Sequence, residues 1–260
     1  MIIPNKDTLE YLAHRVGERQ LTSLPQIIQK DIQGNVDSSK FLDTFGNSNI
    51  TAYVGFIDLA GFSSITHGKQ PNEIAAYLKP FLEKTINIIA EGSALIDKMI
   101  GDEIMFVLPE TEESSNPHEI LFLGQIMGGL HDLAYELQPD YKYRIGISYG
   151  KVNVFHLKGE KYSEWSIVGE PVHVAKRLHG LKELATPEPV CGAFGMALND
   201  FSKESLILTM KQKLEMIAGF ASRFGHEFQT EPREFKGVGK VLWAYLYPKG
   251  DSNSCEVINA

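Results

Sequence analysis

The sequence predicts an α+β fold whose core follows the order β-α-β-β-α-β. Short runs of apolar and aromatic residues alternate with longer segments in which apolar residues recur every three or four positions. Gly-Asp-Glu at 101–103 separates two of the short runs and is typical of a turn between antiparallel strands. These two observations define both the types of the elements and their order.

The first strand and helix follow from the pattern over 50–92. Residues 50–58 form a continuous apolar run that ends at Asp58, as in a strand buried on both faces. A helix is predicted over 74–89, with a kink at Pro80 and an end at Gly92.

The second half of the core begins with a hairpin of the runs 94–100 and 104–108. A helix is predicted to begin at Pro117 and to extend to about residue 137. Two separate strands are then predicted, at 143–148 and at 152–155. This order is the ferredoxin-like arrangement, in which a sheet carries helices on one face.

Further elements are predicted after this core. They are a strand at 165–168, a helix over 171–184, a longer helix within 203–224 and a terminal hairpin around 236–247. We therefore expect a helical N-terminal extension at 1–46, one catalytic domain at 47–249 and a polar tail at 250–260.

Composition and charge narrow the classes of partner. The chain has 260 residues, 43% of them hydrophobic, and a formal net charge of −8. This acidic balance disfavours nucleic acid and anionic membrane surfaces, and it favours a small ligand or a protein partner. Two distant cysteines, no signal pattern and no long apolar run favour a soluble protein of the cytoplasm.

Two carboxylates are candidates for a metal site. Asp58 ends a predicted strand and Asp102 lies in a predicted turn, so the topology can bring both to one edge of the sheet. Mg²⁺ favours one or two carboxylates combined with phosphate oxygens, although aspartates are also common at strand ends and in turns. Residues 59–64 could bind phosphate through backbone N–H groups, or could simply connect a strand to a helix.

Taken together, these segments resemble the catalytic domain of class III nucleotidyl cyclases. Four motifs carry the resemblance by their order and spacing. They are Phe-Ile-Asp-Leu-Ala-Gly-Phe-Ser at 56–63, Asp-Lys-Met-Ile-Gly-Asp-Glu-Ile-Met at 97–105, Arg-Ile-Gly-Ile-Ser-Tyr-Gly at 144–150, and Ile-Val-Gly-Glu-Pro-Val-His-Val-Ala-Lys-Arg-Leu at 167–178. A closing motif at 235–238 completes it, and the resemblance covers about residues 50–247.

The resemblance implies the metal and phosphate ligands of such an enzyme. Asp58 and Asp102, with Ile57, are the implied ligands of two Mg²⁺ or Mn²⁺ ions per site, and Phe62 and Ser63 are implied to hold phosphates.

It also implies residues that contact the rest of a nucleoside triphosphate. Lys98 and Ser166 stand at the positions that recognise the base, and Lys151 stands at a position that faces the triphosphate. Arg177 stands at the position of the arginine that stabilises the transition state. Because family members share active sites between two copies, we expect a homodimer.

One departure concerns catalysis. His173 replaces the asparagine that orients the ribose, so its role in catalysis is an open question. A catalytically silent cyclase-like dimer that binds nucleotide and regulates a partner is therefore one alternative.

The identity of the base also stays open. Ser166 departs from the aspartate of typical mammalian adenylate cyclases, and Lys98 argues against GTP. The motifs resemble the pyrimidine cyclases of Pycsar antiphage systems, which implies cyclic UMP or cyclic CMP as a second messenger for a separate effector. A bacterial adenylate cyclase that makes cyclic AMP is the other alternative.

Overall fold

The structure is a computed structural model that describes residues 48–92, 94–110, 118–137, 141–159, 162–185, 188–199 and 202–249. The predicted extension at 1–46, the predicted tail at 250–260 and Pro117, the predicted start of a helix, lie outside the described residues. No helix within the described ranges is long and apolar enough to span a membrane.

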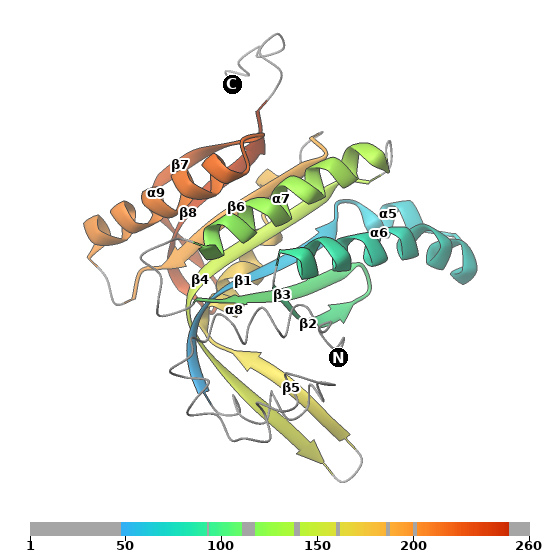
Figure 1. Ribbon diagram of the computed structural model, residues 1–260, viewed down its shortest axis with the longest axis horizontal. Helices are drawn as coiled ribbons and strands as arrows, with labels where there is room; N and C mark the ends of the chain where they lie inside the picture. Colours follow the sequence, from blue (N-terminus) through green and yellow to red (C-terminus); the bar gives the residue numbers. More distant parts are fainter. Residues whose placement is uncertain are drawn as a thin grey trace.

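A single eight-stranded sheet runs through the described part of the chain (Figure 1). Its strands are β1 (Ser48–Leu59), β2 (Leu95–Ile100), β3 (Glu103–Pro109), β4 (Tyr143–Gly159), β5 (Tyr162–Val168), β6 (Val190–Ala197), β7 (Phe224–Phe235) and β8 (Gly239–Pro248). The order is β2-β3-β1-β4-β6-β8-β7, with β5 paired to β4. Strands β4 and β6 are parallel, and the other neighbouring strands are antiparallel.

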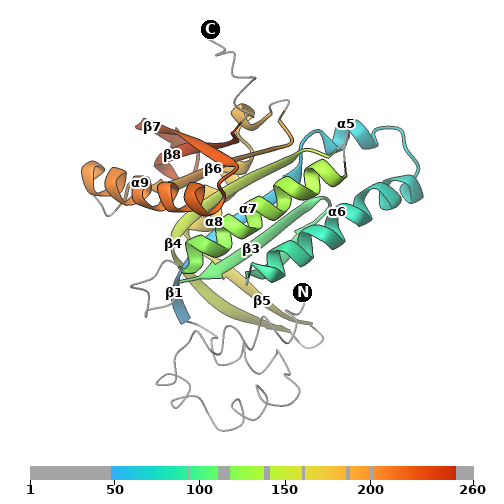
Figure 2. The same cartoon turned by 45° about the horizontal axis from the view of Figure 1, so that its top comes forward.

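Helices cover both faces of this sheet. They are α5 (Phe62–Thr66), α6 (Pro71–Glu91), α7 (His118–Glu136), α8 (Glu170–His179) and α9 (Lys203–Phe220), with a short 3₁₀ helix at Lys182–Leu184. Helices α6, α7 and α9 lie over one face, and α8 lies behind the sheet on the other (Figures 1 and 2). The helices of the predicted core, α6 and α7, thus lie on one face as expected, and α8, which follows that core, covers the other face.

The predicted core is confirmed. Elements β1, α6, β2, β3, α7 and β4 follow the order β-α-β-β-α-β, and their strands lie in the antiparallel order β2-β3-β1-β4 of a ferredoxin-like sheet. The two strands predicted at 143–148 and 152–155 are one strand, because β1 pairs with β4 without interruption from Leu59 opposite Tyr143 to Ser48 opposite Val154.

Elements beyond this core differ from the prediction. Helix α8 ends at His179 rather than near residue 184, since Gly180 caps it and the 3₁₀ helix follows. Strand β6 was not predicted at all, and the terminal hairpin is longer than expected because β7 begins at Phe224.

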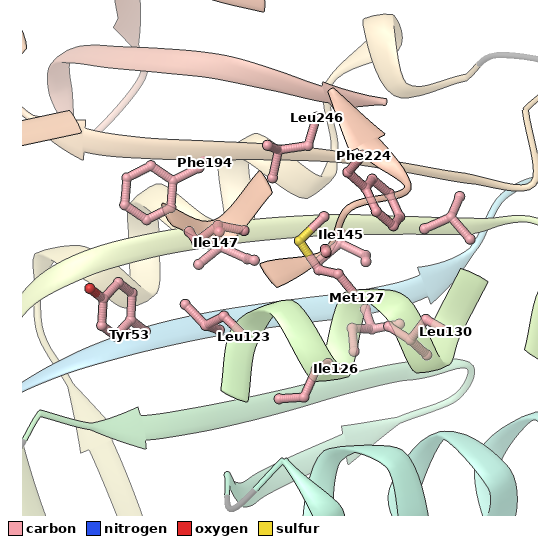
Figure 3. Close-up of a cluster of buried hydrophobic side chains, with 14 of the residues drawn as sticks. Tyr53, Leu123, Ile126, Met127, Leu130, Ile145, Ile147, Phe194, Phe224 and Leu246 are labelled. Atoms are coloured by element: carbon pink, nitrogen blue, oxygen red, sulfur yellow. The ribbon is translucent and has the colours of Figure 1, made fainter. Parts of the chain in front are cut away.

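The main hydrophobic core lies between the sheet and the α6, α7 and α9 face. Figure 3 shows Leu123 and Met127 of α7 packed toward Tyr53, Ile145 and Phe194 of the sheet. All five side chains are buried. Odd-numbered residues of β1 and β4 point into this core, so their even-numbered neighbours point to the α8 face.

Helix α8 lies unusually close to β4. A Cβ atom added at Gly146 would lie 2.3 Å from both the carbonyl oxygen of Ala175 and the backbone nitrogen of His179. A glycine is therefore required here, and the close approach brings the end of α8 against the ends of β1 and β4.

Candidate active site

Asp58 lies near the end of β1, on the face covered by α8. Its partner in the sheet register is Arg144 of β4, so both side chains lie on the same face. Arg144 donates from Nε to Oδ1 of Asp58 at 2.9 Å and from Nη2 to Oδ2 at 2.5 Å. Because the carboxylate is largely buried, this bidentate pair compensates much of its desolvation.

His179 contributes a second cation to Asp58 from α8. Its Nε2 lies 3.3 Å from Oδ2 of Asp58 and 3.1 Å from Oε2 of Glu103. Burial lowers the pKa of the imidazole, but hydrogen bonds to the two carboxylates outweigh burial and raise the pKa to about 9. His179 is therefore an imidazolium at neutral pH.

Asp102 lies beside Asp58, as predicted. The backbone N–H of Leu59 donates to Oδ2 of Asp102 at 3.2 Å. Burial raises the pKa of Asp102, and the negative charge of Asp58 raises it further, against the hydrogen bonds that it accepts. The turn between β2 and β3 thus brings the second carboxylate to the end of β1.

Glu103 belongs to the same charged group. Lys176 and His179 of α8 both donate to its carboxylate, and they lower its pKa although burial opposes them. Helix α8 is in this way attached to the β2–β3 hairpin as well as to β1.

The two aspartates fit a divalent cation. The described residues hold no group of three or more His, Cys, Asp or Glu side chains that could bind a metal by themselves. Two hard carboxylates that disfavour each other's charge nevertheless match a Mg²⁺ or Mn²⁺ site whose other ligands are phosphate oxygens. Asp58 and Asp102 would hold such an ion, with Arg144 as a neighbouring cation.

Ile57, the predicted main-chain metal ligand, lies apart from Phe62 and Ser63, the predicted phosphate ligands. Ile57 is fully buried and is paired to β3 and β4, so its main chain belongs to the sheet ladder, whereas Leu59 directly contacts Asp102. Phe62 and Ser63 begin the short helix α5, directly after β1 and Gly61. They are therefore close in sequence to the Asp58 end of β1.

Lys98 and Ser166 meet although 68 residues separate them. Lys98 of β2 donates from Nζ to Oγ of Ser166 of β5 at 3.0 Å. Lys98 also lies 4.0 Å from Oδ2 of Asp97, and Ser166 is buried. The pair expected to recognise the base is thus a local pair within one copy of the chain.

His173 and Arg177 lie one turn apart on the exposed side of α8. Arg177 is two residues before His179, so the two side chains point about 200° apart around the helix axis. Because His179 points toward Asp58, Arg177 points away from the Asp58 of its own chain.

Lys151 is not brought close to Asp58. It is paired with Thr51 and is seven residues along β4 from Arg144, about 23 Å at the rise of a strand. Strand alternation also places it on the opposite face from Arg144.

Three neighbours of Asp58 were not predicted as site residues: Arg144, Glu103 and His179. Arg144 was inside a quoted motif, and only the β1–β4 register reveals its role. His179 follows Ala175 by four residues on the buried side of α8, so a polar residue in that apolar stripe was the available signal.

Comparison with known proteins agrees with the fold. No family model matches the chain. Among curated proteins it is similar to an adenylate cyclase of Anabaena cylindrica, with 27% identity over 132 residues, 48% of this chain and 26% of that protein. Adenylate cyclase 1 of Rhizobium meliloti is 24% identical over 173 residues, 61% of this chain and 25% of that protein. The chain thus spans about a quarter of the length of these relatives.

Solved structures with the same fold include the adenylyl cyclase CyaB from P. aeruginosa, with a TM-score of 0.58 and 14% identity over 79% of this chain and 97% of that chain. The guanylate cyclase domain of RhGC from Catenaria anguillulae in complex with GTP has a TM-score of 0.55 and 18% identity over 78% of this chain and 98% of that chain. The chain has the fold of class III adenylyl and guanylyl cyclase catalytic domains.

Proposed function

We propose that this chain is a class III nucleotidyl cyclase, which converts a nucleoside triphosphate to its 3′,5′-cyclic monophosphate and pyrophosphate. The observation that carries the proposal is the meeting of Asp58 and Asp102 at one end of β1, in a fold that known cyclases share. Mg²⁺ or Mn²⁺ held by these carboxylates would lower the pKa of the ribose 3′-hydroxyl and neutralise pyrophosphate.

In the proposed reaction the 3′-oxygen attacks the α-phosphorus and loses its proton, while the bond from that phosphorus to the pyrophosphate oxygen breaks. Arg177 stabilises the negative charge that grows on the α-phosphate. Phe62 and Ser63 hold phosphate oxygens, and His173 orients the ribose by a hydrogen bond. Arg144, which already binds one carboxylate, is suited to bind phosphate oxygens as well.

The placement of Arg177 supports a homodimer with shared sites. Arg177 points away from the Asp58 of its own chain, so in the proposed enzyme it acts on a metal-bound α-phosphate of a second copy. Lys98 and Ser166 accompany Arg177 in that second copy, and each dimer has two shared sites. Lys151, which is distant from Asp58 in its own chain, would likewise act across the interface.

The Lys98–Ser166 pair is compatible with a pyrimidine substrate. Since the hydroxyl of Ser166 accepts from Lys98, its own proton is available to a base, and the pair presents donors. The carbonyl oxygens of uracil and cytosine accept from such donors, and so do the ring nitrogens of adenine, so the pair alone does not separate these bases. The preference for UTP or CTP over ATP rests on the resemblance of the motifs to pyrimidine cyclases, and we propose a cyclic pyrimidine nucleotide that activates a separate effector in antiviral defence in the cytoplasm.

Product analysis tests the proposal. The purified protein is incubated with Mn²⁺ and with ATP, GTP, CTP or UTP separately, and products are identified by mass spectrometry. Asp58→Asn and Asp102→Asn are expected to lower product formation by at least about 100-fold, as loss of a metal ligand does.

Each outcome is decisive. Cyclic UMP or cyclic CMP as main product supports the cyclase reaction and the assignment of the base, whereas cyclic AMP overturns only the assignment of the base. No cyclic product from any triphosphate would instead favour the catalytically silent regulatory dimer. Full activity of Asp58→Asn would show that the metal assignment is wrong.

A further inference from the structure

A buried charged group connects β1, which carries Asp58, with β3, which begins directly after Asp102. His179 is at its centre, at the end of α8, with 8% of its side chain exposed. Its Nε2 lies between Oδ2 of Asp58 on β1 and Oε2 of Glu103 on β3. The imidazole thus contacts one metal carboxylate directly and the sequence neighbour of the other.

The hydrogen-bond partners of the ring define its form. Nδ1 lies 2.8 Å from the carbonyl oxygen of Lys176, and Nε2 faces only carboxylate oxygens in these contacts. All three partners are acceptors, so both ring nitrogens must donate. His179 is therefore a fixed cation whose Nε2–H is shared by two carboxylates.

This contact reinforces the connection between the two aspartates. The pairing of β1 with β3 ends at Ile57 opposite Ile104, so Asp58 and Asp102 lie just beyond it. One further connection runs from the backbone of Leu59, next to Asp58, to the carboxylate of Asp102. The second runs from Asp58 through His179 to Glu103, next to Asp102, and groups of this kind around a metal site orient its ligands.

We propose that His179 is a positioning residue for metal binding, which holds Asp58 and, through Glu103, the hairpin that carries Asp102. The inference rests on the proposed function, because it needs the two aspartates to be metal ligands. Loss of the Nε2 contact is expected to weaken Mn²⁺ binding by about 10- to 100-fold, as loss of a supporting hydrogen bond does in other metal sites.

Three variants separate this role from a structural one. His179→Gln can place an amide N–H near the position of Nε2, whereas His179→Asn reaches only the position of Nδ1 and the Lys176 carbonyl. His179→Phe keeps an aromatic ring near Phe56, whose ring centroid lies 5.8 Å from that of the imidazole. Binding of Mn²⁺ alone is measured by the electron paramagnetic resonance signal of the free ion, and thermal melting checks folding.

The order of the Mn²⁺ affinities of the three His179 variants tests the proposal. Near-normal binding by His179→Gln, with weak binding by His179→Asn and His179→Phe, supports the proposal. The reverse order of Gln and Asn would show that the ring only caps α8, and equal affinities in all variants would likewise overturn the proposal. If His179→Phe does not fold, the Gln and Asn variants still give the answer.

Asp58→Asn separates the two proposals. If it binds Mn²⁺ as tightly as the original chain, the metal assignment itself is wrong and the role of His179 fails with it. If Asp58→Asn binds weakly but all His179 variants bind normally, only the role of His179 is overturned.

Discussion

At the scale of single residues, Lys98 and Ser166 offer a direct test of base recognition. Their hydrogen bond joins β2 to β5, and Lys98 keeps 39% of its side chain exposed, so its ammonium can also reach a ligand. Lys98→Met removes the charged donor and keeps most of the stem. We expect kcat/KM for the preferred triphosphate to fall by about 10- to 100-fold, the usual effect of losing a hydrogen bond to a charged group.

The matched control for Lys98→Met is Lys79→Met. Lys79 lies on α6 with 70% of its side chain exposed, and within the described part of the chain its ion-pair partner is Glu83, one turn away. Kinetics with all four triphosphates are the measurement. An equal loss for every base after Lys98→Met would contradict a role in base recognition.

Residue by residue, the predicted contacts came from the topology and from the family resemblance. Asp58 beside Asp102 was expected from the order of strands and turns, Lys98 with Ser166 was implied by the resemblance, and both pairs are found together. The contacts of Arg144 and His179 with Asp58 were not predicted, because they depend on strand register and on where α8 crosses the sheet. Neither source specified that geometry.

At the scale of elements, the contact between α8 and β4 depends on Gly146. A methyl group there would meet backbone atoms of α8 at 2.3 Å, and backbone cannot yield as a flexible side chain does. Gly146→Ala is therefore expected to destabilise the fold by about 1–3 kcal/mol, a typical effect of overpacking. Urea unfolding is the measurement.

Gly128→Ala is the matched control for Gly146→Ala. Gly128 lies within α7, and a Cβ atom there would have no neighbour within 4 Å. Alanine in a helix interior is expected to stabilise by about 0.5–1 kcal/mol relative to glycine. Equal stability of the two variants would show that α8 can move away from β4 without loss.

A second prediction at this scale concerns His131, where α7 contacts β7. The centroid of its ring lies 5.8 Å from that of Phe224 and 4.8 Å from that of Tyr135. Burial, and then the charge of Arg223, lower the pKa of His131. Below the ordinary histidine pKa of about 6.5, the unfolded chain therefore takes up this proton more readily than the folded chain. The contribution of His131 to stability is thus present above that pH and is lost as the pH falls.

The comparison of His131→Gln with the original chain isolates this contribution. Urea unfolding at pH 7.5 and pH 5.5 is expected to show a smaller acid-induced loss of stability in the variant. An equal loss in both proteins would mean that the His131 proton is bound equally well in both states.

The elements that escaped prediction have weak local patterns for identifiable reasons. Strand β6 is Val-Cys-Gly-Ala-Phe-Gly-Met-Ala, with small residues because α8 and β8 approach closely, so it lacks the β-branched character of a typical strand. Strand β7 is a polar edge strand that includes Pro232, as edge strands often do. By contrast, β1, α6 and α7 have strong apolar periodicity and were predicted close to their true bounds.

At the scale of the whole molecule, two sets of candidate site residues lie apart from each other. Asp58 and Asp102 lie at the end of β1, while Arg177 lies on the far side of α8 and Lys98 meets Ser166 of the β4–β5 hairpin. Among the described residues, the pairing of β4 with β1 ends at Val154, from where β4 continues paired with β5, and the hairpin extends away from the rest of the sheet (Figure 2). An extended hairpin of this kind is suited to contact a second copy.

A shared active site predicts that two inactive variants rescue each other. Asp58→Asn lacks a proposed metal ligand and Arg177→Ala lacks the proposed transition-state cation, so a homodimer of either variant is expected to be inactive. In an equal mixture about half of the dimers contain one of each chain, and one of their two sites has both residues intact. We therefore expect about one quarter of the original activity, measured as cyclic nucleotide formed after the two variants are mixed and allowed to exchange.

The control mixes Asp58→Asn with Asp102→Asn. Both changes remove metal ligands that act from the same copy, so a mixed dimer has one ligand missing at each site and no recovery is expected. Recovery in both mixtures would contradict the assignment of both aspartates to one copy. Mass spectrometry first shows that the mixed dimers contain both chains. If neither mixture then recovers activity, Arg177 acts in the same copy as Asp58. That would require α8 to turn by about half a revolution from its position against β4.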